Sequence, residues 1–407
     1  MKQKLNPGNL ILVSYDSTRA DVAYSGKFPG IERLRAGGVT FRNCISSAPL
    51  TPVSHASVMT GLQPYNHGIR HLFRERMNKS CITAAQLLRE RGYETSAVVS
   101  CPGLHNWYGI GRGFTTYDDE IPLLPDGSDA LQTVDVKLRG QALKRAELVV
   151  ERSRQMLEKV PAGKPFFHFI HFFDAHWPYD PPSRPFSFEV ANPYEAEVAY
   201  LDHHFGRWLD YVRDSGRLDD TLIVLFGDHG EDLNGWYPGD KGGEQLNHLE
   251  EMGHGCLLYD QTILVPLVFW HQNLACTEVE EQVRLVDVLP TIADLLGVEL
   301  RHKVDGTSLA DVLQREGQVG DRIGYSETFY PREQVKATKG MFDWTRDKKA
   351  FRVANRYKLI IHLDSDEVEA YDLASDPLET KNLLDSDRNN QLTIRGRRKR
   401  KSSERDE

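Results

Sequence analysis

Residues 221–232 read TLIVLFGDHGED. The run is almost entirely apolar until it reaches Asp228, which His229 follows directly. A continuous apolar run of this length is typical of a strand buried on both faces of a parallel sheet. The segment therefore predicts an α/β fold, with polar side chains at the carboxyl end of a buried strand.

Further segments carry the same pattern, and helical patterns separate them. The other candidate strands are residues 9–15, 93–100, 166–173 and 263–270, and the candidate helices are residues 82–92, about 129–159, 194–216 and 283–297. Strands that alternate with helices favour a mostly parallel sheet covered by helices on both faces. From about residue 350 the chain reads as short alternating strands, which suit a small antiparallel sheet.

The length of 407 residues allows one large domain or two to three smaller ones. We expect a large domain over residues 1–345, a small C-terminal part over residues 346–388 packed on it, and a charged tail over residues 389–407. The tail, RGRRKRKSSERDE, is interpreted as a disordered, solvated terminus. A tether to nucleic acid or anionic lipid is the alternative for that tail.

Charge and cysteine content exclude several classes of protein. The 407 residues carry a formal net charge of -9, which argues against nucleic acid as the main partner. No apolar stretch approaches the length that a bilayer requires, so no membrane span is expected. The five cysteines are odd in number and show no paired metal spacing. Reduced thiols in a cytoplasmic protein are therefore expected.

Three candidate strands end at an aspartate, and histidines lie close to these ends in the sequence. The residues are Asp16, Asp174 and Asp228, with His176, His229 and His254. Sites in open parallel sheets form beyond the carboxyl ends of the strands. Because aspartate and histidine together bind zinc, manganese and similar ions, we expect a divalent metal site there. Unrelated helix caps and surface histidines are the alternative interpretation.

Residues 51–61 read TPVSHASVMTG and predict a short helix. Thr51 suits the N-cap, Pro52 suits the first helical position and Gly61 suits the stop. The positive end of such a helix suits an anion such as phosphate or sulfate. A threonine hydroxyl is a poor nucleophile at neutral pH, but a metal can hold it as an alkoxide. These residues alone leave Thr51 as either a cap or a nucleophile.

The same segment resembles the active-site motif of the sulfatase family, within the alkaline phosphatase superfamily. Other segments resemble that family in the same order, from about residue 9 to 385. They include NLILVSYDSTRAD, with its first metal aspartate, DHGE, its second metal motif, and EAYDLASDPLETKNL, its C-terminal signature. The resemblance implies an αβα sandwich of the alkaline-phosphatase type, with the small antiparallel sheet as a C-terminal subdomain.

The departures from the family pattern bear on the chemistry. In sulfate-cleaving members the nucleophile is a cysteine or serine converted to formylglycine, with proline two residues later and arginine four residues later. This chain has Thr51, Val53 and His55 at those positions, and threonine cannot become formylglycine. The family's Gly-Lys-Trp-His segment is replaced by CPGLHNWYG, and its Asp-Asp pair by Asp16-Ser17. The chain thus resembles threonine-nucleophile branches, such as nucleotide pyrophosphatases, phosphodiesterases and phosphoethanolamine or phosphoglycerol transferases.

That resemblance implies a role for each candidate residue. One divalent metal ion would be bound by Asp16, Thr51, Asp228 and His229, and a second by Asp174, His176 and His254. Zinc or manganese is expected, with calcium as a further option. Thr51 would be the nucleophile, and His55 would either hydrogen-bond near it or simply pack. In sulfatases a segment like HWPY (176–179) contacts substrate instead of metal. Asn106 and Lys241 are candidates for substrate contacts.

We therefore expect a metal-dependent hydrolase of phosphate, phosphonate or sulfate esters that uses Thr51. Its substrate would be a small molecule or an ester on a glycan or lipid head group. The alternatives are a sulfuric ester hydrolase without formylglycine, a phospho-group transferase and a non-catalytic head-group binder. Retention of the metal residues argues against the binder, and the absence of a spanning segment argues against a membrane-anchored transferase.

Overall fold

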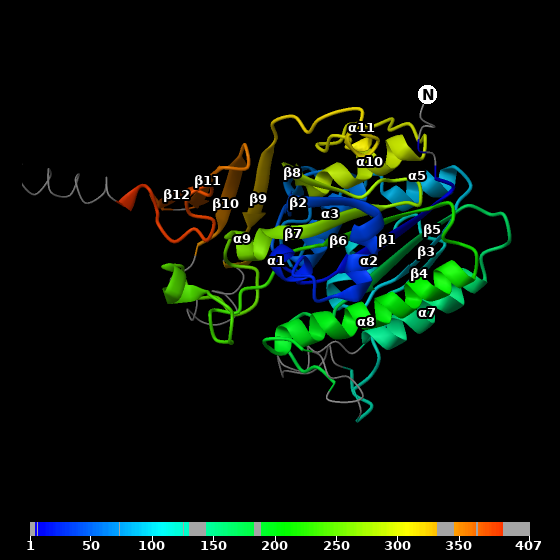
Figure 1. Cartoon of the computed structure of the whole chain (residues 1–407), viewed down its shortest axis with the longest axis horizontal. Helices are drawn as coiled ribbons and strands as arrows, with labels where there is room; N and C mark the ends of the chain where they lie inside the picture. The colour runs from blue at the N-terminus through cyan, green and yellow to red at the C-terminus, as the bar shows by residue number, and fades with distance from the viewer. Residues whose placement is uncertain are drawn as a thin grey trace, which may run out of the picture.

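The computed structural model of the chain contains two sheets (Figure 1). It describes residues 5, 7–72, 74–124, 126–129, 144–182, 189–331, 346–363 and 365–385. Within this part of the chain, one sheet has eight strands and is mostly parallel, and the other has four antiparallel strands. The expected α/β class, with a small antiparallel sheet near the C-terminus, is therefore confirmed.

The large sheet has the strand order β4-β3-β5-β1-β6-β7-β2-β8. Strand β1 lies at its centre and pairs in parallel with β5 and β6, whereas β7 runs antiparallel to β6 and β2. The strands are β1 (Asn9–Tyr15), β2 (Gly38–Ile45), β3 (Glu94–Val98), β4 (Thr116–Asp118), β5 (Phe166–Phe172), β6 (Thr221–Gly227), β7 (Leu264–Trp270) and β8 (Thr277–Arg284).

Helices cover both faces of this sheet, which gives three layers. Helices α3, α5, α10 and α11 pack on one face and helices α1, α2, α7 and α8 on the other. Figure 1 shows α5, α10 and α11 on one side and α7 and α8 on the opposite side. The helices are α1 (Ala20–Ala23), α2 (Pro29–Gly37), α3 (Thr51–Thr60), α4 (Pro64–His67), α5 (Ala84–Glu90), α7 (Ala146–Glu158), α8 (Pro193–Asp214), α9 (Asp260–Ile263), α10 (Val288–Leu295) and α11 (Ala310–Leu313), with the short 3-10 turns η1 (Pro102–Leu104), η2 (Asn106–Tyr108), η4 (Gly243–Leu246) and η5 (Leu285–Asp287).

Alternate residues of the central strands face opposite layers, as the pleat of a strand requires. Each of the three central strands contains two consecutive residues of which the first packs in the core on the α3 side and the second in the core on the α7–α8 side. The pairs are Leu12 and Val13 of β1, Phe169 and Ile170 of β5, and Val224 and Leu225 of β6. The sequence of each strand therefore specifies which layer every side chain meets.

The strand register aligns the ends of the three central strands. Tyr15 of β1 pairs with Phe172 of β5 and with Gly227 of β6. The next residues of β1 and β6 are Asp16 and Asp228, and the alternation places both side chains on the α3 face. Two acidic side chains thus lie level with each other at the carboxyl end of adjacent strands.

The small sheet has the order β12-β11-β10-β9 and is attached to the large one through β9. The Ser326 hydroxyl of β9 donates to the Ser46 carbonyl oxygen (2.6 Å), and the Glu327 N–H donates to the Ser47 carbonyl oxygen (3.0 Å). These serines lie between β2 and α3. The strands are β9 (Ile323–Thr328), β10 (Lys348–Val353), β11 (Tyr357–His362) and β12 (Val368–Asp372).

Several elements differ from the sequence-based expectation. Strands β2 and β8 were not predicted, and β8 reads TEVEEQVR because the last strand of a sheet can expose alternate charged side chains. The helix expected over residues 283–297 begins only at Val288, after β8 and η5. The helix expected over about 129–159 is seen from Ala146, and residues 130–143 lie outside the described part.

The expected domain limits stay predictions. A boundary at residue 346 would divide the small sheet between β9 and β10. The expected tail, residues 389–407, lies outside the described residues. A membrane-spanning helix is not found in the described ranges, since none combines the required length with the required hydropathy.

Candidate active site and metal centre

Two carboxylates meet where the central strands end. Asp16 and Asp228 are both fully buried. The Ser17 N–H donates to Asp228 Oδ1 (3.1 Å), and the Ser17 hydroxyl donates to Asp16 Oδ1 (2.9 Å). Ser17 has a φ of 54°, a left-handed conformation that is uncommon outside glycine. This turn lets one residue bond to both carboxylates.

The Thr51 hydroxyl contacts Asp16 and His229 and does not cap a helix. Helix α3 begins at Thr51 itself, with Leu50 as an extended N-cap and no side-chain cap. The expectation that Thr51 is the N-cap and Pro52 the first helical residue is therefore wrong by one position. The Thr51 hydroxyl lies 3.2 Å from Asp16 Oδ2 and 3.2 Å from His229 Nε2. The helix start thus presents the hydroxyl to two candidate metal ligands.

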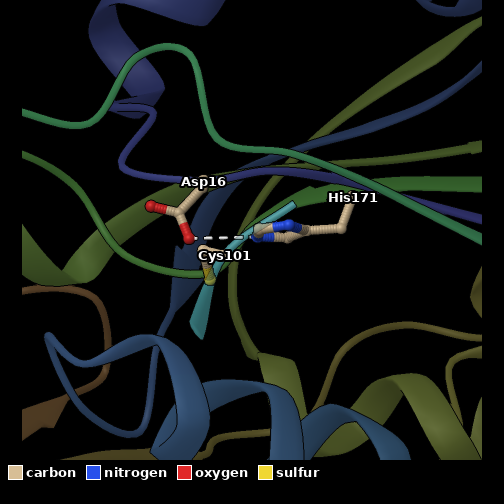
Figure 2. Close-up of side chains that lie close together, drawn as sticks. All are labelled: Asp16, Cys101 and His171. Carbon is tan, nitrogen blue, oxygen red and sulfur yellow. Dashed lines mark hydrogen bonds and ion pairs between the residues drawn. The ribbon is translucent and has the colours of Figure 1, made fainter. Parts of the chain in front are cut away.

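His171 of β5, which sequence reasoning missed, completes the contacts of Asp16. Its Nε2 lies 3.1 Å from Asp16 Oδ2, and its Nδ1 lies 2.9 Å from the Ser100 hydroxyl. The Ser100 hydroxyl donates its hydrogen to the His171 carbonyl oxygen (2.8 Å). Asp16, Cys101 and His171 offer ligand atoms that all lie within 4.8 Å of one another, as drawn together in Figure 2.

Two further groups of candidate ligands follow, one that shares Asp16 with this group and one that shares His229 with the second. In each group, the ligand atoms lie within 4.8 Å of one another. The groups are Asp16, Asp228 and His229, and His229, Glu231 and His254. His254 Nδ1 lies 2.7 Å from Glu231 Oε2, and the Tyr179 hydroxyl donates to Glu231 Oε1 (2.6 Å). Glu231 was not singled out from the sequence, although it belongs to the DHGE motif.

His176 lies beside the last of these groups. Its ring stacks on Phe173 with centroids 4.2 Å apart, and it meets the His254 ring edge-on at 4.9 Å. The His254 ring in turn lies 4.0 Å from the His229 ring. The structure thus brings together His176, His229 and His254, three of the predicted ligands.

Asp174 faces the opposite layer. Its Oδ1 accepts from the Ala146 N–H (3.2 Å) and lies 3.4 Å from Arg145 Nε. Arg145 also pairs with Glu197 (2.6 Å). Burial raises the pKa of Asp174 to about 6, against the opposing charge of Arg145. Among the described residues Asp174 belongs to none of the three ligand groups, so its expected grouping with His176 and His254 is not observed.

His55 contacts the backbone of Thr51. Its Nδ1 lies 2.8 Å from the Thr51 carbonyl oxygen and its Nε2 lies 2.9 Å from the Ser14 hydroxyl. Burial lowers the pKa of His55 to about 3, so the ring is neutral at physiological pH. These contacts match the packing alternative for His55, and a catalytic role for it stays a prediction.

The two candidate substrate contacts lie on exposed turns. Asn106 begins η2, and its backbone N–H donates to Asp119 (2.7 Å). Lys241 is exposed, and its carbonyl oxygen accepts from the Gln261 side chain (2.5 Å). Within the described residues, neither Asn106 nor Lys241 forms a hydrogen bond with Thr51, Asp16 or His229, and their roles stay predictions.

Burial and close charges set the protonation of the two carboxylates. Burial acts to raise the pKa of Asp16, but the hydrogen bond from His171 and the charge of His229 outweigh it and hold that pKa well below its usual range. Burial and the charge of Asp16 raise the pKa of Asp228 well above its usual range. Two carboxylates this close do not both ionise unless a cation lies between them.

The donor atoms fit a divalent cation. Asp228 Oδ2 is buried and lacks a hydrogen-bond partner among the described residues, and it lies 3.4 Å from His229 Nε2. A buried unpaired carboxylate oxygen is costly unless a cation compensates it. Burial also lowers the pKa of His229 to about 3, which leaves a neutral imidazole for a metal. Asp16, Thr51, Asp228 and His229 are the residues that would hold the ion.

Comparison with known proteins agrees with this architecture. The family model for sulfatases matches residues 8–298, and a model for the C-terminal part of N-sulphoglucosamine sulphohydrolase matches residues 254–405. An arylsulfatase of Clostridium perfringens is 20% identical over 470 residues, covering 93% of this chain and 90% of that protein.

Solved structures show the same fold. A protein in complex with its substrate D-glucosamine-2-N,6-O-disulfate has a TM-score of 0.71 and 18% identity, covering 98% of each chain. A phosphonate monoester hydrolase of Agrobacterium radiobacter has a TM-score of 0.71 and 18% identity, covering 98% of this chain and 95% of that one. The sulfatase model matches well over half of the chain, including β1 to β8 and helix α3, so it covers Asp16, Thr51, Asp228 and His229. The chain therefore belongs to the sulfatase family and is a hydrolase.

Proposed function

We propose that the chain is a metal-dependent hydrolase of phosphate or phosphonate esters, with Thr51 as the nucleophile. The observation that carries this proposal is the position of the Thr51 hydroxyl, 3.2 Å from both Asp16 Oδ2 and His229 Nε2. Phosphorus esters are favoured over sulfate because threonine cannot form the formylglycine of sulfate-cleaving family members. The fold likeness to a phosphonate monoester hydrolase is consistent with this choice.

The protein groups around Thr51 can activate its oxygen and hold the substrate. Asp16 Oδ2 accepts the hydrogen of the Thr51 hydroxyl and so aligns its lone pairs away from that carboxylate. The positive end of α3 faces the anionic ester, because the helix begins at the nucleophile. A divalent ion held at this site would lower the pKa of the hydroxyl and stabilise charge on the ester oxygens.

The leaving-group side of the site is formed by histidines. Thr51 and the His254 side chain are 7% and 12% exposed, whereas Asp16 and His229 are fully buried. An ester can therefore approach from the side of Thr51 and His254. Glu231 fixes the His254 ring through Nδ1 (2.7 Å). Burial raises the pKa of Glu231 to about 7, so a protonated Glu231 can donate to Nδ1, and the single ring proton of His254 then lies on Nε2 for transfer to the departing oxygen. Water then attacks the ester formed on Thr51.

Sulfate ester hydrolysis is the second candidate. It is favoured by the match of residues 254–405 to the C-terminal part of N-sulphoglucosamine sulphohydrolase. The likeness to a protein solved with a disulfated glucosamine points the same way. Under this alternative Thr51 would have to support sulfuryl transfer without formylglycine.

A rate comparison tests both candidates. Protein freed of metal and reloaded with zinc, manganese or calcium is assayed on an aryl phosphate diester, a phosphate monoester, a phosphonate monoester and an aryl sulfate. We expect the phosphorus esters to react fastest, and Thr51→Ala to lower kcat on the order of 10⁴-fold. Thr51→Ser, which keeps a hydroxyl, is the matched control and should retain measurable turnover. Fastest cleavage of the sulfate would favour the second candidate, and full activity of Thr51→Ala would exclude the nucleophile.

A further inference from the structure

Cys101 belongs to the core on the α3 side and also lies beside Asp16 and His171. Its Sγ is within 4.8 Å of an Asp16 carboxylate oxygen and of a His171 ring nitrogen (Figure 2). The sulfur is buried and forms no disulfide. Tetrahedral zinc with bonds of about 2.0–2.3 Å separates its ligand atoms by roughly 3.3–3.8 Å. The pair Asp16 Oδ2 and His171 Nε2, at 3.1 Å, is already close to that spacing.

The surroundings of His171 are those of a metal-binding histidine. Such residues donate their second ring N–H to a fixed acceptor, which sets the tautomer and the ring orientation. The Ser100 hydroxyl would supply that acceptor once metal is bound: it lies 2.9 Å from Nδ1 and gives its own hydrogen to the His171 carbonyl oxygen. The Ser100 backbone N–H also lies 3.3 Å from Nδ1, and metal binding through Nε2 would replace that hydrogen bond. Nε2 is thereby directed at Asp16, the residue shared with the Asp228 group.

The segment that carries Cys101 is packed against the nucleophile. A Cβ added at Gly103 would lie 3.3 Å from Thr51 Cβ and 3.5 Å from Cys101 Sγ. Glycine therefore allows the turn η1 to approach Thr51 closely. Asp228, whose buried Oδ2 lacks a hydrogen-bond partner within the described residues, belongs to the adjoining ligand group, which shares Asp16 with this position.

Taken with these contacts, and resting on the metal-dependent function proposed above, we infer that Cys101 is a thiolate ligand of a metal ion. Asp16 and His171 complete this position, and Asp16 joins it to the Asp228–His229 group. Sulfur and imidazole suit zinc, whereas calcium takes six to eight oxygen ligands. The site therefore selects zinc over calcium.

The binding step balances in protons. As the metal–sulfur bond forms, the Cys101 thiol releases its proton to solvent. His171 binds the ion through the Nε2 lone pair, and its single ring proton then lies on Nδ1, where the Ser100 hydroxyl oxygen accepts it. No oxidant or reductant takes part.

Cobalt in place of zinc reports the sulfur directly. The full chain is freed of metal with a chelator and titrated with Co²⁺, and the near-ultraviolet charge-transfer band of a thiolate–cobalt bond is recorded. We expect the band in the wild type and in Cys44→Ser, and its loss in Cys101→Ser. Cys44 is the matched control because it is also buried, yet it belongs to no ligand group in the described residues. A band that persists in Cys101→Ser, or that is missing from the wild type, overturns the inference.

Two measurements keep the inference testable if Cys101→Ser does not fold. X-ray absorption of the zinc-loaded wild type should show sulfur at about 2.3 Å, and a shell of only nitrogen and oxygen would refute the thiolate. Ser100→Ala should weaken zinc binding on the order of 10–100-fold by removing the partner of His171. Ser96→Ala is its control, since Ser96 contacts His168 instead (2.8 Å), and unchanged zinc affinity in Ser100→Ala would count against the assigned position.

These results are separable from the proposed activity. Ester turnover by a protein whose zinc shell lacks sulfur would leave the hydrolase standing and remove Cys101 from the site. A sulfur shell without turnover on any of the four esters would do the reverse.

Discussion

Three aspartates have similar sequence contexts but lie on opposite faces of the large sheet: Asp16 and Asp228 on one face and Asp174 on the other. Each follows a buried apolar strand of the same sheet. Asp16 and Asp228 are the first residues after their strands and face α3, where the Thr51 hydroxyl lies. Asp174 is the second residue after β5 and faces α7, where it contacts Arg145.

The difference shows that a single residue decides the layer into which a strand-end carboxylate points. Side chains alternate along a strand, so the face of a residue follows from its offset to the aligned strand ends. In β5 the residue level with Asp16 is Phe173, and the preceding residue on the α3 face is His171, which pairs with Ser14 and contacts Asp16. The third strand therefore supplies a histidine to the site where an aspartate was expected.

The largest expected effect is on turnover, and it is tested by replacing Asp16 and Asp174 by asparagine one at a time. Asp16→Asn removes the carboxylate charge beside the Thr51 hydroxyl and an anionic candidate metal ligand, and kcat should fall on the order of 10⁴-fold. Asp174→Asn keeps an acceptor for the Ala146 N–H, and kcat should stay within a few-fold of the wild type. Comparable losses of kcat in the two variants, measured on the preferred ester, would return Asp174 to the site.

On the α7 side, the expected effect is on stability. Arg145→Ala leaves Asp174 and Glu197 buried without their cation, which should lower the free energy of unfolding by about 3 kcal/mol at pH 8. Burial already raises the pKa of Asp174 to about 6 and that of Glu197 to about 7. Both values lie above those of an unfolded chain, so protonation favours the folded state and the loss should shrink as pH falls towards 5.

Denaturant unfolding at two pH values measures this effect. Arg213→Ala is the control, because its partners Asp210 and Asp214 are exposed and such pairs contribute about 0–1 kcal/mol. A loss for Arg145→Ala that is no larger than for the control, or that grows as pH falls, would contradict the buried cluster.

The two histidines of β5, His168 and His171, also face opposite layers, and a smaller effect on stability is expected from His168. His168 faces α7 and bonds to Ser96 (2.8 Å) and Ser153 (2.7 Å), and burial lowers its pKa to about 3. The unfolded chain binds this proton at higher pH, so stability is lost as pH falls from about 6.5, by up to about 1.4 kcal/mol per pH unit. His168→Gln should reduce that slope without changing ester turnover.

Urea unfolding between about pH 4 and pH 6 gives the slope. His171→Gln is the paired variant, and it should lose metal binding and turnover instead. If His168→Gln kept the wild-type slope, the burial of a neutral imidazole at this position would be disproved.

The smallest expected effect concerns the approach of η1 to the nucleophile. In Gly103→Ala the new Cβ would lie 3.3 Å from Thr51 Cβ, so one of the two must shift by a few tenths of an ångström. We expect kcat to fall by less than about tenfold, because small displacements of a reacting group already slow its reaction. Gly320→Ala, where nothing lies within 4 Å of the added Cβ, should be silent. Equal kcat in the two variants would show that η1 does not position Thr51.

The sequence predicted what depends on local pattern. The apolar runs located β1, β3, β5, β6 and β7 to within two residues at each end, and the motif around Thr51 located the hydroxyl at the site. Strands β2 and β8 were not predicted, because their polar residues resemble those of a surface segment. In β2 the polar residues Thr40, Arg42 and Asn43 interrupt the apolar ones, and β8 has only two apolar residues, so neither shows a continuous apolar run.

The remainder depends on register, which one strand does not encode. His171 stands in the aromatic run FFHFIHFF, where alternation alone gives two faces but not which of them meets α3. Only the alignment of Tyr15 with Phe172 places His171 near Asp16 and Asp174 away from it. Ser17 likewise replaces a family carboxylate, yet its left-handed turn still joins Asp16 to Asp228.

The attachment of β9 has a consequence for exchanging parts between family members. Ser326 and Glu327 bond to the backbone of Ser46 and Ser47, and the Ser46 hydroxyl donates to the Asp228 carbonyl oxygen (2.5 Å). A chimaera joined at residue 346 would match a host β9 with a foreign β10. Joining before Ile323 would transfer the small sheet whole, together with the hydrogen bonds that hold the chain four residues ahead of Thr51.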